Sequence, residues 1–178
     1  GCLEHGVKVL TLYAFSSENW SRPDEEVSDL MGLLRLYIKK EVSTLNKQGV
    51  QLKFIGQRER LAPDIIKQIE DAENRTKLNN KLTLVIALNY GGQAEIVDAA
   101  KKLTRQVLSG AMQVDDITEE TLSSSLYTAD WKDPDLIIRT SGEQRLSNFM
   151  LWQVAYSEFL FMDLLWPDFN KNSLDEAI

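Results

Sequence analysis

The chain has 178 residues, enough for one globular domain with a substantial core, and its composition of 43% hydrophobic and 26% charged residues is ordinary for a globular protein. Its formal net charge of −7 argues against a general nucleic-acid binder, but a local arginine cluster could still bind a small phosphorylated substrate. The single cysteine, Cys2, allows no internal disulfide, and the single histidine, His5, makes a Ser-His-Asp triad an unfavoured interpretation. No apolar run reaches the length of a membrane span and no signal peptide opens the chain, so we expect a cytoplasmic protein that could contact a membrane surface.

The first half of the chain alternates strand and helix patterns. Leu3 and Val7 are spaced as on a helix, which predicts the end of a helix before a strand at Val7–Phe15. After the polar loop Ser16–Arg22, Pro23 is suited to a first helical position, and apolar residues recur at helical spacing as far as Gly49, a natural helix C-cap. A strand and a helix are then expected in turn at Val50–Ile55 and Pro63–Lys77.

The second half continues the alternation. Leu82–Tyr90 is almost entirely apolar, which is typical of a strand buried on both faces. Gly91-Gly92 could admit a phosphate, but a tight strand-to-helix turn is the favoured interpretation. The elements expected next are helices at Gln93–Leu108 and Thr118–Leu126, a buried strand at Asp135–Ile138, a polar loop at Thr140–Asn148, a short helix at Phe149–Tyr156, a strand at Phe159–Met162 and a helix from Ser173. This order predicts a single α/β domain, residues 1–178, with a mainly parallel sheet flanked by helices.

Ligand sites of open α/β sheets lie beyond the carboxyl ends of the strands. The segment Arg139–Asn148 follows an expected strand and contains two arginines, several hydroxyl and amide side chains and a glycine, which a diphosphate pocket needs. Its composition alone is equally compatible with an ordinary solvated loop. The earlier loop carries Asn19, Trp20 and Arg22, but Trp20 could simply anchor the next helix and Arg22 could simply precede its start.

An isolated carboxylate, Glu158, lies in an apolar stretch just before an expected strand. Such a carboxylate is either exposed or paired, because burying a lone charge is costly. Magnesium would pair it, since this ion accepts few protein carboxylates and completes its shell with water and substrate phosphate. Glu143 is a weaker candidate for the same role.

Four long motifs resemble one enzyme family, the bacterial undecaprenyl diphosphate synthases, which are cis-prenyltransferases. The motifs are LYAFSSENWSRP at Leu12–Pro23, NYGG at Asn89–Gly92, DLIIRTSGEQRLSNFMLWQ at Asp135–Gln153 and AYSEFLFMDLLWPD at Ala155–Asp168. The similarity extends over essentially the whole chain. It implies a parallel sheet wrapped by helices with an apolar tunnel, and a homodimer that needs Mg²⁺. It also implies repeated condensation of isopentenyl diphosphate onto farnesyl diphosphate with Z geometry, giving undecaprenyl diphosphate, the lipid carrier for peptidoglycan.

The resemblance also implies roles for individual residues. Those expected to bind the diphosphate of isopentenyl diphosphate are Arg139, Arg145 and Ser147, and Leu146 is also expected to contact substrate. Glu158 is expected to contribute to the magnesium site. Those expected to lie against substrate at the first loop are Ser16, Ser17, Glu18, Trp20 and Arg22, supported by Glu26. Asn19 is the catalytic candidate, and because an amide is a poor base we expect it to position or relay a proton rather than abstract one. Candidate tunnel residues are Ala14, Met31, Leu34 and Leu82, each of which could instead be plain core.

One family feature is not found among these residues. The family begins with a strand that ends in an Asp-Gly-Asn-Gly-Arg-type loop, which supplies a metal-binding catalytic Asp, and it ends with a basic tail. We therefore expect an N-terminally incomplete chain that is inactive alone. Two other interpretations stay open: a non-catalytic partner subunit of a heteromeric cis-prenyltransferase, and an unrelated α/β phosphate-binding enzyme, although no glycine-rich phosphate-binding motif of a nucleotide-binding fold is present.

Overall fold

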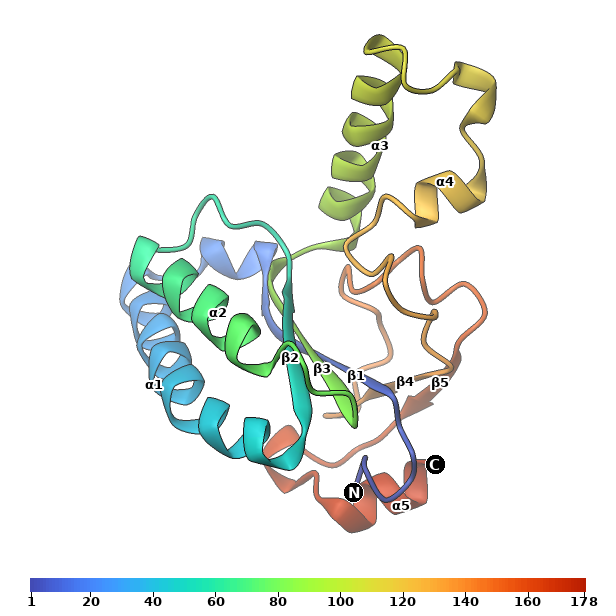
Figure 1. The fold of residues 1–178 in the computed structure, drawn as a ribbon. Helices are drawn as coiled ribbons and strands as arrows, with labels where there is room; N and C mark the ends of the chain where they lie inside the picture. The colour runs from blue at the N-terminus through green and yellow to red at the C-terminus, as the bar shows by residue number, and fades with distance from the viewer. The chain divides into compact units, whose positions relative to one another are not determined.

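The computed structural model describes residues 1–178, which form two compact units (Figure 1). One unit comprises Cys2–Tyr90, and the other comprises Gly91–Ile178 together with Gly1. Every strand pair in both units is parallel, which confirms the α/β class and the parallel pairing expected from the sequence. None of the helices combines the length and the apolar character that crossing a membrane requires. The single-domain interpretation stays a prediction.

The unit Cys2–Tyr90 is built on a three-stranded parallel sheet. Its strands are β1 (Val9–Ser16), β2 (Val50–Ile55) and β3 (Leu82–Tyr90), in the spatial order β1-β3-β2. The central strand β3 forms hydrogen bonds with both neighbours, and its last four residues are all buried. This central place explains why the β3 sequence is almost continuously apolar rather than alternating.

Two helices cover one face of this sheet (Figure 1): α1 (Asp24–Gln48) and α2 (Pro63–Thr76). The α1 helix ends as expected at Gly49, whose φ of 78° gives the left-handed C-cap and whose N–H donates to the carbonyls of Leu45 and Asn46. The core between helices and sheet consists of Phe15, Val27, Met31, Ile38, Val42, Leu52, Phe54, Leu61, Ile65, Ile69, Ala72 and Leu88.

The four candidate tunnel residues differ in burial. Met31 belongs to this core, and Leu34 packs against it. Leu82 is also buried, whereas Ala14 is exposed on β1. Both Met31 and Leu34 therefore contribute to ordinary core packing, and the tunnel stays a prediction.

The unit Gly91–Ile178 contains a two-stranded sheet and several short helices. Its elements are α3 (Gly92–Leu108), η2 (Val114–Asp116), α4 (Glu119–Ser123), β4 (Leu136–Arg139), β5 (Glu158–Phe161), η3 (Trp166–Asp168) and α5 (Lys171–Ala177). Both strands are displaced by one residue from their expected positions, and β4 is half-buried rather than buried. Thr118 caps α4, since its hydroxyl accepts a hydrogen bond from the Thr121 N–H, and the helix ends three residues earlier than expected.

The expected short helix at Phe149–Tyr156 is wrong, because this segment forms turns. Met150 has a φ of 47°, in the left-handed region that a right-handed helix cannot use. Gln153 is 2% exposed, and its Nε2 donates to Glu95 Oε2 on α3 at 3.0 Å and to Thr128 Oγ1 at 2.9 Å. A buried polar network therefore fixes this segment in a path other than a helix.

The helix expected to end near Val7 is also wrong. The first residues form turns, in which the Gly6 N–H donates to the Leu3 carbonyl and the Val7 N–H donates to the Cys2 carbonyl. Gly6 has a φ of 70°, which ends any helical path at this point.

Candidate active site

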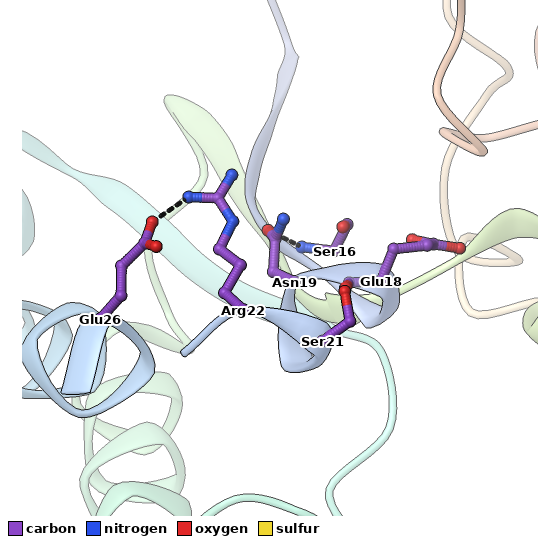
Figure 2. A network of polar contacts seen from close by, with 6 residues as sticks. All are labelled: Ser16, Glu18, Asn19, Ser21, Arg22 and Glu26. Carbon is purple, nitrogen blue, oxygen red and sulfur yellow. Dashed lines mark hydrogen bonds and ion pairs between the residues drawn. The ribbon is translucent and has the colours of Figure 1, made fainter. Parts of the chain in front are cut away.

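The predicted loop Ser16–Arg22 is a short 3-10 helix, η1 (Ser17–Ser21), that begins where β1 ends. Its first turn is closed by Asn19, whose Oδ1 accepts a hydrogen bond of 3.0 Å from the Ser16 N–H (Figure 2). The Asn19 carbonyl accepts from the Arg22 N–H at 3.1 Å, and the Ser21 hydroxyl donates to the Glu18 carbonyl at 2.7 Å. The loop is therefore held by its own polar groups. This capping bond uses Asn19 Oδ1 and leaves the side-chain N–H donors available to a ligand.

Arg22 and Glu26 form the second pair of this network. Arg22 follows η1, Glu26 lies in the first turn of α1, and their side chains form an ion pair across one helical turn (Figure 2). Both side chains are about half exposed, so the guanidinium can reach a ligand while the carboxylate holds its direction. An acidic first turn also complements the positive end of the α1 dipole. The structure thus brings together Ser16, Asn19, Arg22 and Glu26 as one surface network.

Trp20 is held more firmly than a simple helix anchor would be. It packs against the core, its ring meets Phe15 edge-on with centroids 5.1 Å apart, and its Nε1 donates to Asn89 Oδ1 at 2.7 Å. The Arg60 guanidinium lies over the indole ring, 4.5 Å from its centroid. Asn89 and Arg60 were not among the predicted site residues, although Asn89 opens the NYGG motif.

The predicted arginine loop follows β4 in the other unit. Arg139 is the last residue of β4, and its carbonyl accepts from the Met162 N–H at 2.8 Å. The N–H groups of Ser141 and Gly142 donate to the carbonyls of Leu164 and Met162, so backbone bonds to the chain beyond β5 anchor the start of the loop. The described left-handed positions in this segment are Ser141, Gly142, Ser147, Asn148 and Met150. These bonds and left-handed turns make the segment a folded loop rather than a loose solvated one.

Arg145 extends from this loop into solvent. Its guanidinium pairs with Glu143 at 2.8 Å, and both side chains remain accessible. An exposed arginine with an exposed partner can exchange that carboxylate for a phosphate group, because the planar guanidinium binds both in the same bidentate way. Ser147, the other predicted diphosphate ligand, adopts a left-handed φ of 52° two residues further on.

Asn148 connects the arginine loop to the start of α3. This connection was not predicted from the sequence. Its Oδ1 accepts from the Gln93 N–H at 2.9 Å, and its carbonyl accepts from the Gly92 N–H at 2.7 Å. A Cβ on Gly92 would lie 2.8 Å from Leu151 Cγ, so only glycine permits this close approach. The tight strand-to-helix turn expected at Gly91-Gly92 is confirmed, and it serves to hold the end of the arginine loop.

Glu158 and Arg139 occupy different ends of the small sheet. Glu158 opens β5 in register with Leu136, whereas Arg139 closes β4 in register with Phe161. The neighbouring carboxylate, Asp135, is paired with Lys132 at 2.6 Å, and this hydrogen bond lowers the pKa of Asp135. No cluster of three or more His, Cys, Asp or Glu side chains suited to a metal is formed. Glu158 is an exposed single carboxylate, which fits an ion whose remaining ligands are water and substrate oxygens but does not by itself define a metal site.

Comparison with known proteins identifies the family. A family model described as "Putative undecaprenyl diphosphate synthase" matches residues 1–178. An isoprenyl transferase of Agrobacterium fabrum is 53% identical over 173 residues, covering 97% of this chain and 70% of the relative.

Two solved structures are similar along nearly the whole chain. Lavandulyl diphosphate synthase from Lavandula x intermedia, in complex with dimethylallyl diphosphate, has a TM-score of 0.94 at 38% identity, covering 98% of this chain and 75% of that one. A probable undecaprenyl diphosphate synthase from Campylobacter jejuni has a TM-score of 0.88 at 33% identity, with coverages of 98% and 80%. This chain therefore belongs to the undecaprenyl diphosphate synthase family and is a cis-prenyltransferase.

Proposed function

We propose that this protein condenses isopentenyl diphosphate repeatedly onto farnesyl diphosphate and releases a long (Z)-polyprenyl diphosphate. The observation that carries the proposal is the Arg139–Asn148 loop. It presents an exposed guanidinium on a backbone fixed at its start by Met162 and Leu164, and at its end by the first residues of α3. A diphosphate needs this kind of rigid, cationic, donor-rich surface.

The residues of this chain would act mainly through charge and position. In each condensation, the allylic carbon–oxygen bond breaks, a carbon–carbon bond to isopentenyl diphosphate forms, and a proton and a diphosphate depart. Arg139, Arg145 and Ser147 would hold the isopentenyl diphosphate, while Arg22 would stabilise charge on the allylic diphosphate. Asn19 would position the reacting groups through its side-chain N–H, which its capping bond to the Ser16 N–H leaves available.

Magnesium would be held by Glu158 together with substrate oxygens. When bound, the ion would help to neutralise the charge of the diphosphate groups. The support is the exposure of Glu158 and its oxygen chemistry, which suits a hard cation that keeps few protein ligands.

A homodimer is supported by the apolar surface of the unit Gly91–Ile178. Phe159 and Phe161 on β5 are exposed and stack on each other, and Leu165 and Trp166 are exposed a few residues later. Several exposed apolar side chains within eight residues favour a protein contact on this unit. We further propose undecaprenyl diphosphate, the lipid carrier for peptidoglycan, as the product, on the strength of the family description and the Campylobacter jejuni relative.

The test is a condensation assay on the complete gene product with farnesyl diphosphate, labelled isopentenyl diphosphate and Mg²⁺, with products separated by chain length. We expect elongation to an undecaprenyl-length product, and its loss in EDTA. Arg105→Ala, which removes an exposed arginine of α3, is the matched control for changes in the arginine loop. A folded protein that binds both substrates without turnover would contradict the catalytic proposal and favour a partner-subunit role.

A further inference from the structure

Asn89 is a buried polar residue at the carboxyl end of the central strand β3 and is 3% exposed. Both polar atoms of its side chain are used within the unit Cys2–Tyr90. Its Oδ1 accepts from Trp20 Nε1 at 2.7 Å, and its Nδ2 donates to the Gln57 carbonyl at 2.8 Å. Its backbone carbonyl also accepts from the Gln57 N–H at 3.1 Å. Asn89 therefore links three elements: the end of β3, the loop after β2, and η1.

The position demands asparagine for two reasons. The φ of Asn89 is 49°, a left-handed conformation that asparagine tolerates better than most residues. One short side chain must also accept from an indole N–H and donate to a carbonyl at the same time. Aspartate has no donor for the Gln57 carbonyl, and alanine has neither group.

Gly56 brings Gln57 within reach of Asn89. A Cβ on Gly56 would lie 2.1 Å from the Leu88 carbonyl oxygen, so the chain after β2 passes directly against the end of β3. The φ of Gly56 is 112°, which L side chains rarely adopt. The Gln57–Asn89 hydrogen bonds are thus part of a close backbone contact rather than an incidental surface contact.

Trp20 is fixed on three sides by these neighbours. Asn89 holds the indole N–H, Phe15 meets the ring edge-on, and the Arg60 guanidinium lies over its face. Trp20 is in the middle of η1, between Asn19 and the Arg22–Glu26 pair. Because these contacts fix the indole, they anchor the stretch of η1 that lies next to Asn19 and Arg22.

We propose that Asn89 is a positioning residue for allylic substrate binding: through its hydrogen bond to Trp20 it sets the orientation of η1 and of the groups η1 presents. This inference rests on the proposed function, in which η1 contacts the allylic diphosphate. Asn89 itself does not touch substrate. Arg60 contributes by holding a face of the indole through a cation–π contact.

The test is a double-mutant cycle of Asn89→Ala and Trp20→Phe in the complete gene product. Phenylalanine keeps an aromatic ring for Phe15 and Arg60 but lacks the N–H. Each single change is expected to raise the KM for farnesyl diphosphate about five- to thirtyfold, as the loss of one buried hydrogen bond implies, with the KM for isopentenyl diphosphate within about twofold. The double variant is expected to raise this KM by the same factor as either single variant, because both changes remove the same hydrogen bond. Independent effects would instead multiply the two factors.

Asn79→Ala is the matched control. Asn79 also bridges elements by its side chain, donating to the Val50 carbonyl at 2.8 Å and to Asn46 Oδ1 at 2.9 Å, but it lies before β3, at the other end of that strand. The Asn79→Ala variant is expected to have a lower melting temperature and an unchanged KM for both substrates. An Asn89→Ala variant that behaves like Asn79→Ala, or independent effects in the cycle, would overturn the proposal.

Binding of farnesyl thiodiphosphate, an unreactive allylic analogue, separates this inference from the proposed function. If the wild type binds the analogue but does not condense farnesyl diphosphate with isopentenyl diphosphate, the catalytic proposal fails. The Kd values of the variants for the analogue then still test the role of Asn89. We expect these Kd values to rise by the same factor as the KM. Unchanged Kd values would overturn the positioning role, and a wild type that does not bind the analogue would overturn both proposals.

Discussion

Removing the Glu95 carboxylate should destabilise the unit Gly91–Ile178 strongly. Glu95 is 1% exposed on α3, and it accepts hydrogen bonds from the Tyr127 N–H at 2.8 Å and from Gln153 Nε2 at 3.0 Å. Glu95→Ala leaves these donors without that acceptor and opens a cavity. Gln153 is already incompletely satisfied, since its buried Oε1 has no hydrogen-bond partner.

The expected loss can be worked from these contacts. A hydrogen bond to a charged group contributes about 1.5–3 kcal/mol, and part of the loss is recovered because Gln153 Nε2 still donates to Thr128. We expect Glu95→Ala to lower the free energy of unfolding by about 2–5 kcal/mol. The free energy of unfolding of a typical domain is about 5–15 kcal/mol, so this is a large part of it. At roughly 2–4 °C per kcal/mol for a chain of this size, the melting temperature should fall by about 4–20 °C.

Glu95→Gln is the informative comparison. The glutamine keeps an oxygen that can accept from the Tyr127 N–H. Its amide nitrogen, however, would face Gln153 Nε2, so that two hydrogen-bond donors would oppose each other. Turning over the Gln153 amide would remove that conflict by placing its unpartnered Oε1 against the new donor. We therefore expect the loss from Glu95→Gln to be less than half of the loss from Glu95→Ala. Urea unfolding of both variants measures the difference, and a loss below about 0.5 kcal/mol for Glu95→Ala, or a larger loss for Glu95→Gln, would refute this reasoning.

Three further predictions concern the arginine loop, the metal and an exposed ion pair. Arg145→Ala should raise the KM for isopentenyl diphosphate about ten- to 150-fold, from the loss of a charged hydrogen bond of about 1.5–3 kcal/mol, and an unchanged KM would remove Arg145 from that site. Glu158→Ala should raise the Mg²⁺ concentration needed for half-maximal rate, so an unaltered magnesium titration would count against Glu158. The hydrogen bond from Arg35 lowers the pKa of Asp64, so the pair stabilises the fold above the ordinary carboxyl pKa and that contribution is lost as the pH falls through the lowered value. The small stability difference between wild type and Asp64→Asn should accordingly be constant near neutral pH and disappear in strong acid, whereas a difference that grew in acid would contradict the assignment.

Much of the fold could be predicted because local signals were strong. Strands β2 and β3 have the bounds expected from their apolar patterns, and α1 ends at Gly49 as expected. Each of these segments combines a clear apolar pattern with a glycine directly after its end. The error at Phe149–Tyr156 arose because a tertiary contact overrides local pattern, since a buried hydrogen bond from Gln153 to α3 decides the path. The error before Val7 arose from a local feature, the left-handed φ of Gly6.

The candidate site could be predicted only in part from the sequence. The family motifs located the arginine loop and η1, because those residues are contiguous. The residues that hold them in place were missed, since Asn89 contacts Trp20 across 69 positions and Asn148 contacts Gln93 across 55. A single sequence carries no signal for contacts at such separations. The one local feature that points to Asn89 is its place at the start of the NYGG motif.

The most direct test of the central claim is the geometry of the double bond that the enzyme makes. The complete gene product would be incubated with farnesyl diphosphate, isotopically labelled isopentenyl diphosphate and Mg²⁺, and the purified product examined by NMR. We expect every newly added unit to carry a Z double bond. Newly added units with E geometry would contradict the assignment as a cis-prenyltransferase.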